Sequence, residues 1–207
     1  MSNIPETIFI VDDDPAVLNG LSRLLRSAGL NVQTFLSPEE FLSHHDPQAP
    51  GCLILDVSMP GLNGLELQEA LNNGGSAIPI IFLTGHGTVP ASVQAMKRGA
   101  LDFLAKPVDE KDLLDAIQLA IEQDRVTRLN RAEIGEIQRR LDTLTPRERE
   151  VLTHIVSGQL NKQIAFDLGT VEKTIKVHRA RVLEKMKVHS VAELVHLYER
   201  AGLGGTN

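Results

Sequence analysis

Apolar residues in the first half of the chain follow two alternating patterns. Short, continuous apolar runs are typical of buried strands, and the stretches between them carry apolar residues at helical spacing, as at Val17, Leu21 and Leu25. Five runs alternating with helical stretches predict an α/β domain with a doubly wound, five-stranded parallel sheet. The expected strands are Thr7–Val11, Asn31–Phe35, Gly51–Asp56, Pro79–Thr84 and Leu101–Leu104.

Three helix-start signals support this division. Asp14-Pro15 places an N-cap residue before a proline at the first helical position. Ser37-Pro38-Glu39-Glu40 and Thr145-Pro146-Arg147-Glu148 both have the sequence of a capping box. We expect a helix to begin at each of the three.

The pattern changes near Asp124, beyond which no strand candidate appears. We interpret residues 1–124 as one domain, 125–143 as a partly helical linker, and 144–207 as a small all-α domain. The linker's sparse apolar positions leave two alternatives open, a solvated connector or a short coiled coil with a second copy. The helices expected after it are Pro146–Ser157, Lys162–Leu168, Val171–Lys187 and Val191–Ala201.

Charge divides along the same boundary. The net charge of −6 combines −11 in residues 1–124 with +5 in residues 125–207, which suggests that only the second half contacts nucleic acid. The 207 residues include 42% hydrophobic and 23% charged positions, as in soluble globular proteins. Cys52, the one cysteine, lies in an apolar run and is expected to be buried. Neither a leader nor a membrane-spanning stretch is evident, so we expect a cytoplasmic protein without a membrane partner.

Reactive side chains gather where the predicted strands end. Asp12 and Asp13 end the first strand, Asp56 ends the third, Thr84 ends the fourth, and Lys106 follows the fifth. Sites in such sheets lie beyond the carboxyl ends of the strands. Asp12 and Asp13 could be a solvated strand end, but the accompanying Lys106-Pro107 favours a buried, ordered triad of carboxylates. Clustered carboxylates need a compensating cation, for which Mg²⁺ suits oxygen ligands. A carboxylate beside Mg²⁺, a hydroxyl and an ammonium could accept a phosphoryl group.

These residues resemble the receiver domain of two-component response regulators, over about residues 6–124. The motifs are Ile10-Val11-Asp12-Asp13-Asp14, Leu55-Asp56-Val57-Ser58-Met59-Pro60-Gly61, Thr84 and Lys106-Pro107. The resemblance implies a flavodoxin-like fold, a histidine kinase as partner and no activity beyond the domain's own Mg²⁺-dependent phosphorylation and dephosphorylation. It also implies that phosphorylation produces a homodimer through the face from about Val89 to Ile121.

The resemblance assigns a role to each residue of this site. Asp56 would be the phosphoacceptor. Asp13, Asp56 and the backbone carbonyl of Ser58 would bind Mg²⁺, with Asp12 acting through water. Thr84 and Lys106 would bind the phosphoryl oxygens. Phe103 matches the position of the switch aromatic, with a plain core residue as the alternative. Asp14, by its place before Pro15, is expected to be only a helix cap.

Further segments resemble the FixJ subgroup, among them Pro50-Gly51-Cys52-Leu53 and Thr84-Gly85-His86-Gly87. Many members carry arginine where Ser58 stands, which puts the lifetime of the phosphoryl group in doubt but not metal binding through the backbone. His86 borders the site, and we assign it no catalytic role.

The second half contains a candidate helix-turn-helix, in which Gly169-Thr170 separates two helices and the second is rich in basic residues. A solvated basic face would look the same. However, Leu144–Leu152, Asn161-Lys162-Gln163-Ile164-Ala165 and Thr174-Ile175-Lys176-Val177-His178 together resemble the LuxR/FixJ-type DNA-binding domain over about residues 140–200.

By that resemblance, Lys176 and Val177 face base edges, while Thr174 and His178 reach the DNA backbone. Lys173 and Arg181 complete the expected DNA-binding residues, and Ala180 stands where some members carry a base-contacting lysine. The implied partners are promoter DNA with inverted half-sites and RNA polymerase, and activation is expected over repression.

Other functions fit parts of the sequence. A phosphatase of the haloacid dehalogenase type would use Asp12 as nucleophile and Asp14 as acid–base. The residue that carries the acyl phosphate distinguishes the two functions: Asp56 in a receiver domain and Asp12 in the phosphatase. A Rossmann-type nucleotide site is disfavoured because Val11–Pro15 replaces a glycine loop. A third alternative is an output domain that binds protein, which salt-dependent binding to duplex DNA would exclude.

Overall fold

The computed structural model describes residues 5–85 and 89–203. The chain forms two compact units, Met1–Arg128 and Leu129–Asn207, and the boundary between them falls inside its longest helix. Among the residues that the structure describes, we find no helix with the length and hydropathy of a membrane span.

The first unit contains a five-stranded, all-parallel sheet in the order β2-β1-β3-β4-β5, which confirms the predicted fold class. The fourth strand begins at Ile80 rather than Pro79, and the fifth is shifted by one residue along the chain. Strand limits of this kind are set by ladder hydrogen bonds, which the apolar pattern does not show. The strands are β1 Thr7–Val11, β2 Asn31–Phe35, β3 Gly51–Asp56, β4 Ile80–Thr84 and β5 Asp102–Ala105.

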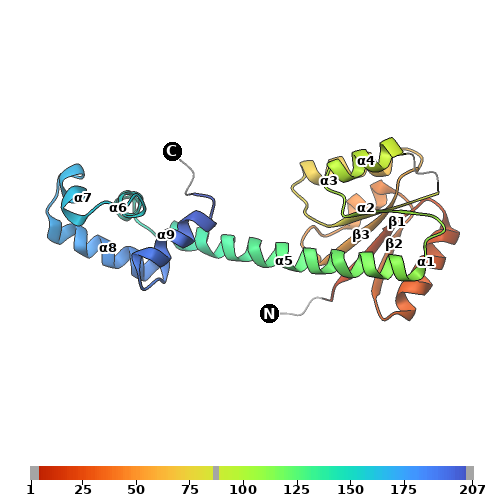
Figure 1. Cartoon of the computed structure of the whole chain (residues 1–207), viewed down its shortest axis with the longest axis horizontal. Helices are drawn as coiled ribbons and strands as arrows, with labels where there is room; N and C mark the ends of the chain where they lie inside the picture. Colours follow the sequence, from red (N-terminus) through yellow and green to blue (C-terminus); the bar gives the residue numbers. More distant parts are fainter. Residues whose placement is uncertain (1–4, 86–88, 204–207) are drawn as a thin grey trace. The chain divides into compact units, whose positions relative to one another are not determined.

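Helices cover both faces of the sheet (Figure 1). Successive residues of a strand point to opposite faces, so Ile8 and Ile10 pack under α1 and α5, whereas Phe9 packs under α2, α3 and α4. Cys52 is fully buried on the α1/α5 face, which confirms its expected burial, and this burial raises the pKa of its thiol to about 12. The helices are α1 Pro15–Ser27, α2 Pro38–His44, α3 Gly64–Asn73, α4 Val89–Lys97 and α5 Glu110–Asp142.

Most of the expected helix caps are present. Asp14 accepts a hydrogen bond from the Ala16 N–H at 2.7 Å, as an N-cap should. Ser37 caps α2 by accepting from the Glu40 N–H, but the Glu40 carboxylate turns further back and accepts from the Leu36 N–H at 2.8 Å. The predicted capping box at Ser37 is therefore only half formed.

Helix α5 continues through the segment interpreted as a linker and ends only at Asp142. Ion pairs one turn apart, such as Arg128–Asp124 and Arg140–Glu136, stabilise its polar stretch. These ion pairs stabilise the helical conformation where few apolar residues are available to pack.

The second unit packs helices α6–α9 around one apolar core. Two residues of α5, Ile137 and Leu141, are buried in that core, at 1% and 4% exposure. Both lie in the segment interpreted from the sequence as a linker, whereas in the structure they pack as core residues of this unit. The helices are α6 Pro146–Val156, α7 Asn161–Asp167, α8 Glu172–Met186 and α9 Val191–Arg200.

Candidate functional site

An ammonium group joins two buried carboxylates at the carboxyl edge of the sheet. Asp12 follows β1, Asp56 ends β3 and Lys106 follows β5, so parallel strands bring all three to one edge. The Lys106 Nζ donates to Asp12 Oδ2 at 2.5 Å and to Asp56 Oδ1 at 2.7 Å. The Asp12 and Asp56 side chains are only 4% and 6% exposed, so this charge pairing is shielded from water.

The second oxygen of each carboxylate is held by the backbone. Asp12 Oδ1 accepts from the Asp14 N–H at 3.0 Å, and Asp56 Oδ2 accepts from the Ser58 N–H at 2.7 Å. Burial raises the pKa of Asp12, partly offset by its hydrogen bond from Lys106. Burial opposes the charge on Lys106, but hydrogen bonds to Asp12 and Asp56 raise the pKa of its ammonium overall. The Asp56 carboxylate is thus fixed in orientation.

Asp13 departs from the prediction. The triad was expected to be buried, yet Asp13 is exposed. Asp12 turns inward to Lys106 and also accepts from the Asp14 N–H, and Asp13 between them is left at the solvent. The Asp12 and Asp56 predictions of burial are confirmed.

The donor set fits a hard cation by its chemistry. Its side-chain ligands are oxygens, and three carboxylates exceed the single charge of Lys106. Nevertheless, across the described parts of the chain no three acidic, histidine or cysteine side chains lie close enough to share a metal ion. The expected ligands Asp12, Asp13 and Asp56 therefore do not form a closed metal cage, and the backbone carbonyl of Ser58 would be needed.

Thr84 and Phe103 lie on the neighbouring strands. Thr84 ends β4 and is 1% exposed, and its carbonyl accepts from the Lys106 N–H at 2.8 Å. Phe103 is half-buried on β5, with its ring centroid 5.9 Å from that of Phe82. The structure therefore brings the predicted ammonium and carboxylates into contact, and places Thr84 at the end of the strand next to the one that Asp56 ends. His86 lies outside the described residues.

Gly64 begins α3 directly against the backbone of the phosphoacceptor candidate. A Cβ atom at Gly64 would lie 2.1 Å from the Asp56 carbonyl oxygen, well inside any permitted contact. The Gly64 N–H donates to the Val57 carbonyl at 3.1 Å. Glycine is required here by close approach.

At the opposite end of β3, a buried ion pair between Asp124 and Arg128 bonds the backbone, and the sequence did not predict it. Asp124 is 4% exposed, and its Oδ2 accepts from the Gly51 N–H at 3.0 Å and from Arg128 Nε at 2.7 Å. Arg128 also donates to the carbonyls of Gln48 and Ala49. The backbone groups that they bond lie 73 to 80 residues earlier in the sequence, so no local pattern could have predicted these bonds.

In the second unit, α8 presents one basic, exposed face. Lys173, Lys176, Val177 and Arg181 are exposed, and Thr174 and His178 are half-buried. Ile175, Val182 and Met186 point the other way and are fully buried. The predicted DNA-binding residues therefore lie on or beside one face of the helix.

Two further cations of α8 are used within the unit. Lys185 Nζ donates to the buried Glu148 Oε2 at 2.6 Å, and this pairing holds the pKa of the Glu148 carboxyl at about 2. Arg179 Nη1 donates to Asn161 Oδ1 at 3.1 Å on α7. Glu148 therefore has a structural role within the unit, and Lys185 is engaged in that pairing.

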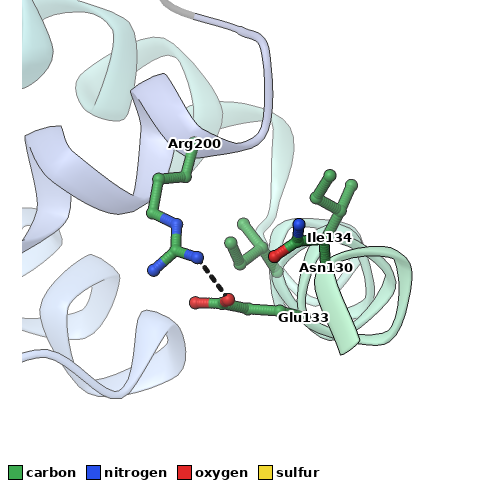
Figure 2. Close-up of a pocket in the computed structure, with 5 residues that line it drawn as sticks. Asn130, Glu133, Ile134 and Arg200 are labelled. Atoms are coloured by element: carbon green, nitrogen blue, oxygen red, sulfur yellow. Dashed lines mark hydrogen bonds and ion pairs between the residues drawn. The ribbon is translucent and has the colours of Figure 1, made fainter. Parts of the chain in front are cut away.

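A shallow groove of about 300 Å³ lies between α5 and α9 within the second unit. Figure 2 shows Arg200 of α9 pointing to Glu133 of α5, with Arg200 Nη2 2.6 Å from Glu133 Oε2. Asn130 and Ile134 line the same groove. The groove is open to solvent along the contact between the two helices and does not enclose a ligand cavity.

A receiver sheet with this acidic edge, joined to a basic helix-turn-helix, defines a DNA-binding response regulator. Residues 8–118 match the family model of the response regulator receiver domain, and residues 142–198 match that of the bacterial regulatory proteins of the luxR family. The chain belongs to the two-component response regulators of the LuxR/FixJ type. The alternative that the chain is a phosphatase of the haloacid dehalogenase family is therefore wrong.

Individual relatives span nearly the whole chain. The response regulator protein TodT of Pseudomonas putida is 46% identical over 200 residues, covering 97% of this chain and 88% of TodT. The transcriptional regulatory protein FixJ of Bradyrhizobium diazoefficiens is 41% identical over 196 residues, covering 95% and 96%. A solved structure of the response regulator StyR is 46% identical, with a TM-score of 0.84 and coverage of 95% and 99%.

Proposed function

We propose that Asp56 accepts a phosphoryl group from a partner histidine kinase and that this controls DNA binding by α8. The observation that carries the proposal is the pairing of Lys106 Nζ with Asp56 Oδ1 at 2.7 Å, at the edge where Asp12 and Thr84 also lie. A fixed carboxylate can act as the nucleophile toward phosphorus, and a neighbouring ammonium and hydroxyl can bind the transferred oxygens.

Mg²⁺ would be held by Asp13, Asp56 and the Ser58 carbonyl, with Asp12 acting through water. When bound it would neutralise charge on the phosphoryl oxygens. The chain's own residues do the rest. The Ser58 N–H orients Asp56, and Lys106 shifts from bonding the carboxylate to bonding the transferred oxygens.

The proposed output is a homodimer formed through the face from about Val89 to Ile121. Phosphorylation adds charge and acceptors beside Thr84 and Lys106. Thr84 moves toward the phosphoryl group, and Phe103, half-buried beside Phe82, turns into the space it leaves. A symmetric dimer then presents two copies of α8 to inverted half-sites, from which RNA polymerase is recruited and transcription activated.

The proposal is tested with a small-molecule phosphodonor and Mg²⁺. Intact mass should show one added phosphoryl group on the wild type and on Asp46→Asn, an exposed carboxylate in a loop, but none on Asp56→Asn. Light scattering should then show a doubled mass for the wild type only when phosphorylated. Phosphorylation of Asp56→Asn, or phosphorylated wild type that stays monomeric with unchanged DNA affinity, would contradict the proposal.

A further inference from the structure

A buried amide of α3 bonds the last turn of α4. Gln68 of α3 is fully buried, and its Nε2 donates to the Ala95 carbonyl of α4 at 3.1 Å. Its Oε1 is buried as well, and among the residues that the structure describes no donor bonds it. A buried amide with one unpaired end is costly in a protein core. Leucine has a similar size and would avoid that cost, so the feature that sets Gln68 apart is its bond to α4.

Further polar contacts join the same end of α4 to α3. Asn72 Nδ2 donates to the carbonyl of Arg98, the residue that directly follows α4, at 3.0 Å. Arg98 Nη1 in turn donates to the Leu65 carbonyl at 3.3 Å and pairs with Glu69 Oε2 at 3.1 Å. The acceptors at Ala95 and Arg98 are backbone atoms. These contacts therefore fix the position of the helix backbone rather than that of a side chain.

The described side chains of α4 otherwise point mostly to solvent. Of the α4 side chains that the structure describes, only Ala95 is buried, whereas Val93 and Met96 are each 46% exposed. The helix begins at Val89, at the start of the face through which we propose that the protein dimerises. Among these residues, the restraint on α4 therefore lies at its C-terminal end, where Gln68 bonds it.

We infer that Gln68 is a positioning residue, which holds α4 in the arrangement where Lys106 bonds the Asp56 carboxylate. This inference rests on the proposed function, in which phosphorylation alters the face that begins with α4. A displacement of α4 carries the Ala95 carbonyl away from Gln68 Nε2, and neither end of the amide is then paired. Each protomer releases this bond before two such faces pair. The bond thus sets part of the free energy that phosphorylation must supply.

The test replaces Gln68 by leucine in the full-length protein. The Ala95 carbonyl keeps its bonds from the Arg98 N–H at 3.2 Å and the Ala100 N–H at 3.0 Å, so no polar group is left unpaired. We therefore expect the melting temperature of Gln68→Leu to be unchanged or raised.

The dimer dissociation constant is measured without phosphodonor, by sedimentation over a series of protein concentrations. One hydrogen bond contributes a factor of about five, and both protomers lose one. We therefore expect Gln68→Leu to lower this constant about 25-fold, since the square of five applies to a symmetric dimer.

Amide hydrogen exchange measures the same restraint in the monomer. Peptides from α4 should exchange about fivefold faster in Gln68→Leu than in the wild type, because one bond less opposes the opening of this helix. Peptides from α1 should exchange at the wild-type rate.

Three further variants complete the test. Gln33→Leu makes the same chemical change at an exposed position of β2, an edge strand of the sheet, and should leave both measurements at their wild-type values. Asn72→Ala removes the bond to the Arg98 carbonyl and should shift both in the direction of Gln68→Leu, by a smaller factor because Asn72 is exposed. Asn73→Ala, at the exposed last residue of α3, is its control and should shift neither.

The outcomes separate this inference from the function beneath it. If the wild type dimerises on phosphorylation but Gln68→Leu keeps the wild-type dissociation constant, the role of Gln68 is overturned and the proposed function stands. Weaker dimerisation together with a lower melting temperature would show an ordinary core residue and would also overturn that role. If the phosphorylated wild type stays monomeric, the proposed function fails, and α4 exchange at the wild-type rate in Gln68→Leu overturns the restraint independently.

Discussion

Replacing Glu148 by glutamine should destabilise the second unit markedly. The Glu148 side chain is 3% exposed and its Oε2 accepts from Lys185 Nζ at 2.6 Å and from the Thr145 N–H at 2.9 Å. Glutamine keeps the shape and one acceptor but removes the charge. Lys185 then faces a neutral amide, and its remaining bond is to the Thr143 carbonyl at 3.0 Å.

The magnitude follows from the carboxyl pKa. Lys185, and then the Thr145 N–H, hold the pKa of Glu148 at about 2, against an ordinary 4.5. Each pKa unit corresponds to about 1.4 kcal/mol, so the shift gives roughly 3 kcal/mol. Since the Lys185 side chain is 33% exposed, solvent screening reduces this, and we expect a loss of about 2–3 kcal/mol at pH 7.

The sign of the pH dependence is also fixed. A carboxyl whose folded pKa is depressed contributes stability that is complete above its ordinary pKa and is lost as the pH falls toward the folded value. The difference between wild type and Glu148→Gln should therefore be full at pH 7, shrink below 4.5 and vanish near 2.

The chain supplies a selective probe for this experiment. It has no tryptophan and one tyrosine, Tyr198, which packs against the core of the second unit. Denaturant unfolding followed by tyrosine fluorescence thus reports on that unit alone. Glu150→Gln is the matched control, because Glu150 pairs with Arg147 on the surface and should cost less than about 0.5 kcal/mol. Equal losses in the two variants, or a Glu148→Gln loss that is the same at pH 3 and pH 7, would refute this reasoning.

Two further predictions use the same fluorescence assay. Ile137→Ala should cost the second unit about 2–5 kcal/mol by leaving a cavity, whereas Ile134→Ala, at a 44% exposed neighbour, should cost far less; comparable losses would mean that α5 is not part of that core. Val171→Ser should stabilise the unit by about 0.5–2 kcal/mol, because Val171 occupies the N-cap of α8 without a side-chain acceptor, and a neutral or negative effect would contradict this assignment.

The sequence predicted the sheet and the position of its reactive edge well, for identifiable reasons. Buried parallel strands are continuous apolar runs, and their carboxyl ends share one edge, so Asp12, Asp56 and Lys106 could be placed together without a structure. The direction of individual side chains was not accessible in this way. The exposure of Asp13 depends on how Asp12 is held by Lys106, a partner 94 residues away.

Helices α5 and α8 also contain contacts that the sequence pattern could not predict. The polar stretch after Asp124 has the composition of a connector, but ion pairs keep it helical, and the burial of Ile137 depends on helices that come later in the chain. Likewise, Lys185 looks like any other basic residue of α8 until the buried Glu148 is found opposite it. Pairings of this kind are set by tertiary packing, which a single sequence does not encode locally.

The contact between Gly64 and the Asp56 carbonyl has a consequence for how this domain can vary. Even alanine, the smallest side chain, would drive the first turn of α3 away from the strand that ends in the phosphoacceptor candidate. Variation among relatives or in a mutant library can therefore reshape the surface of α3, but its first residue is confined to glycine for as long as this helix starts where it does.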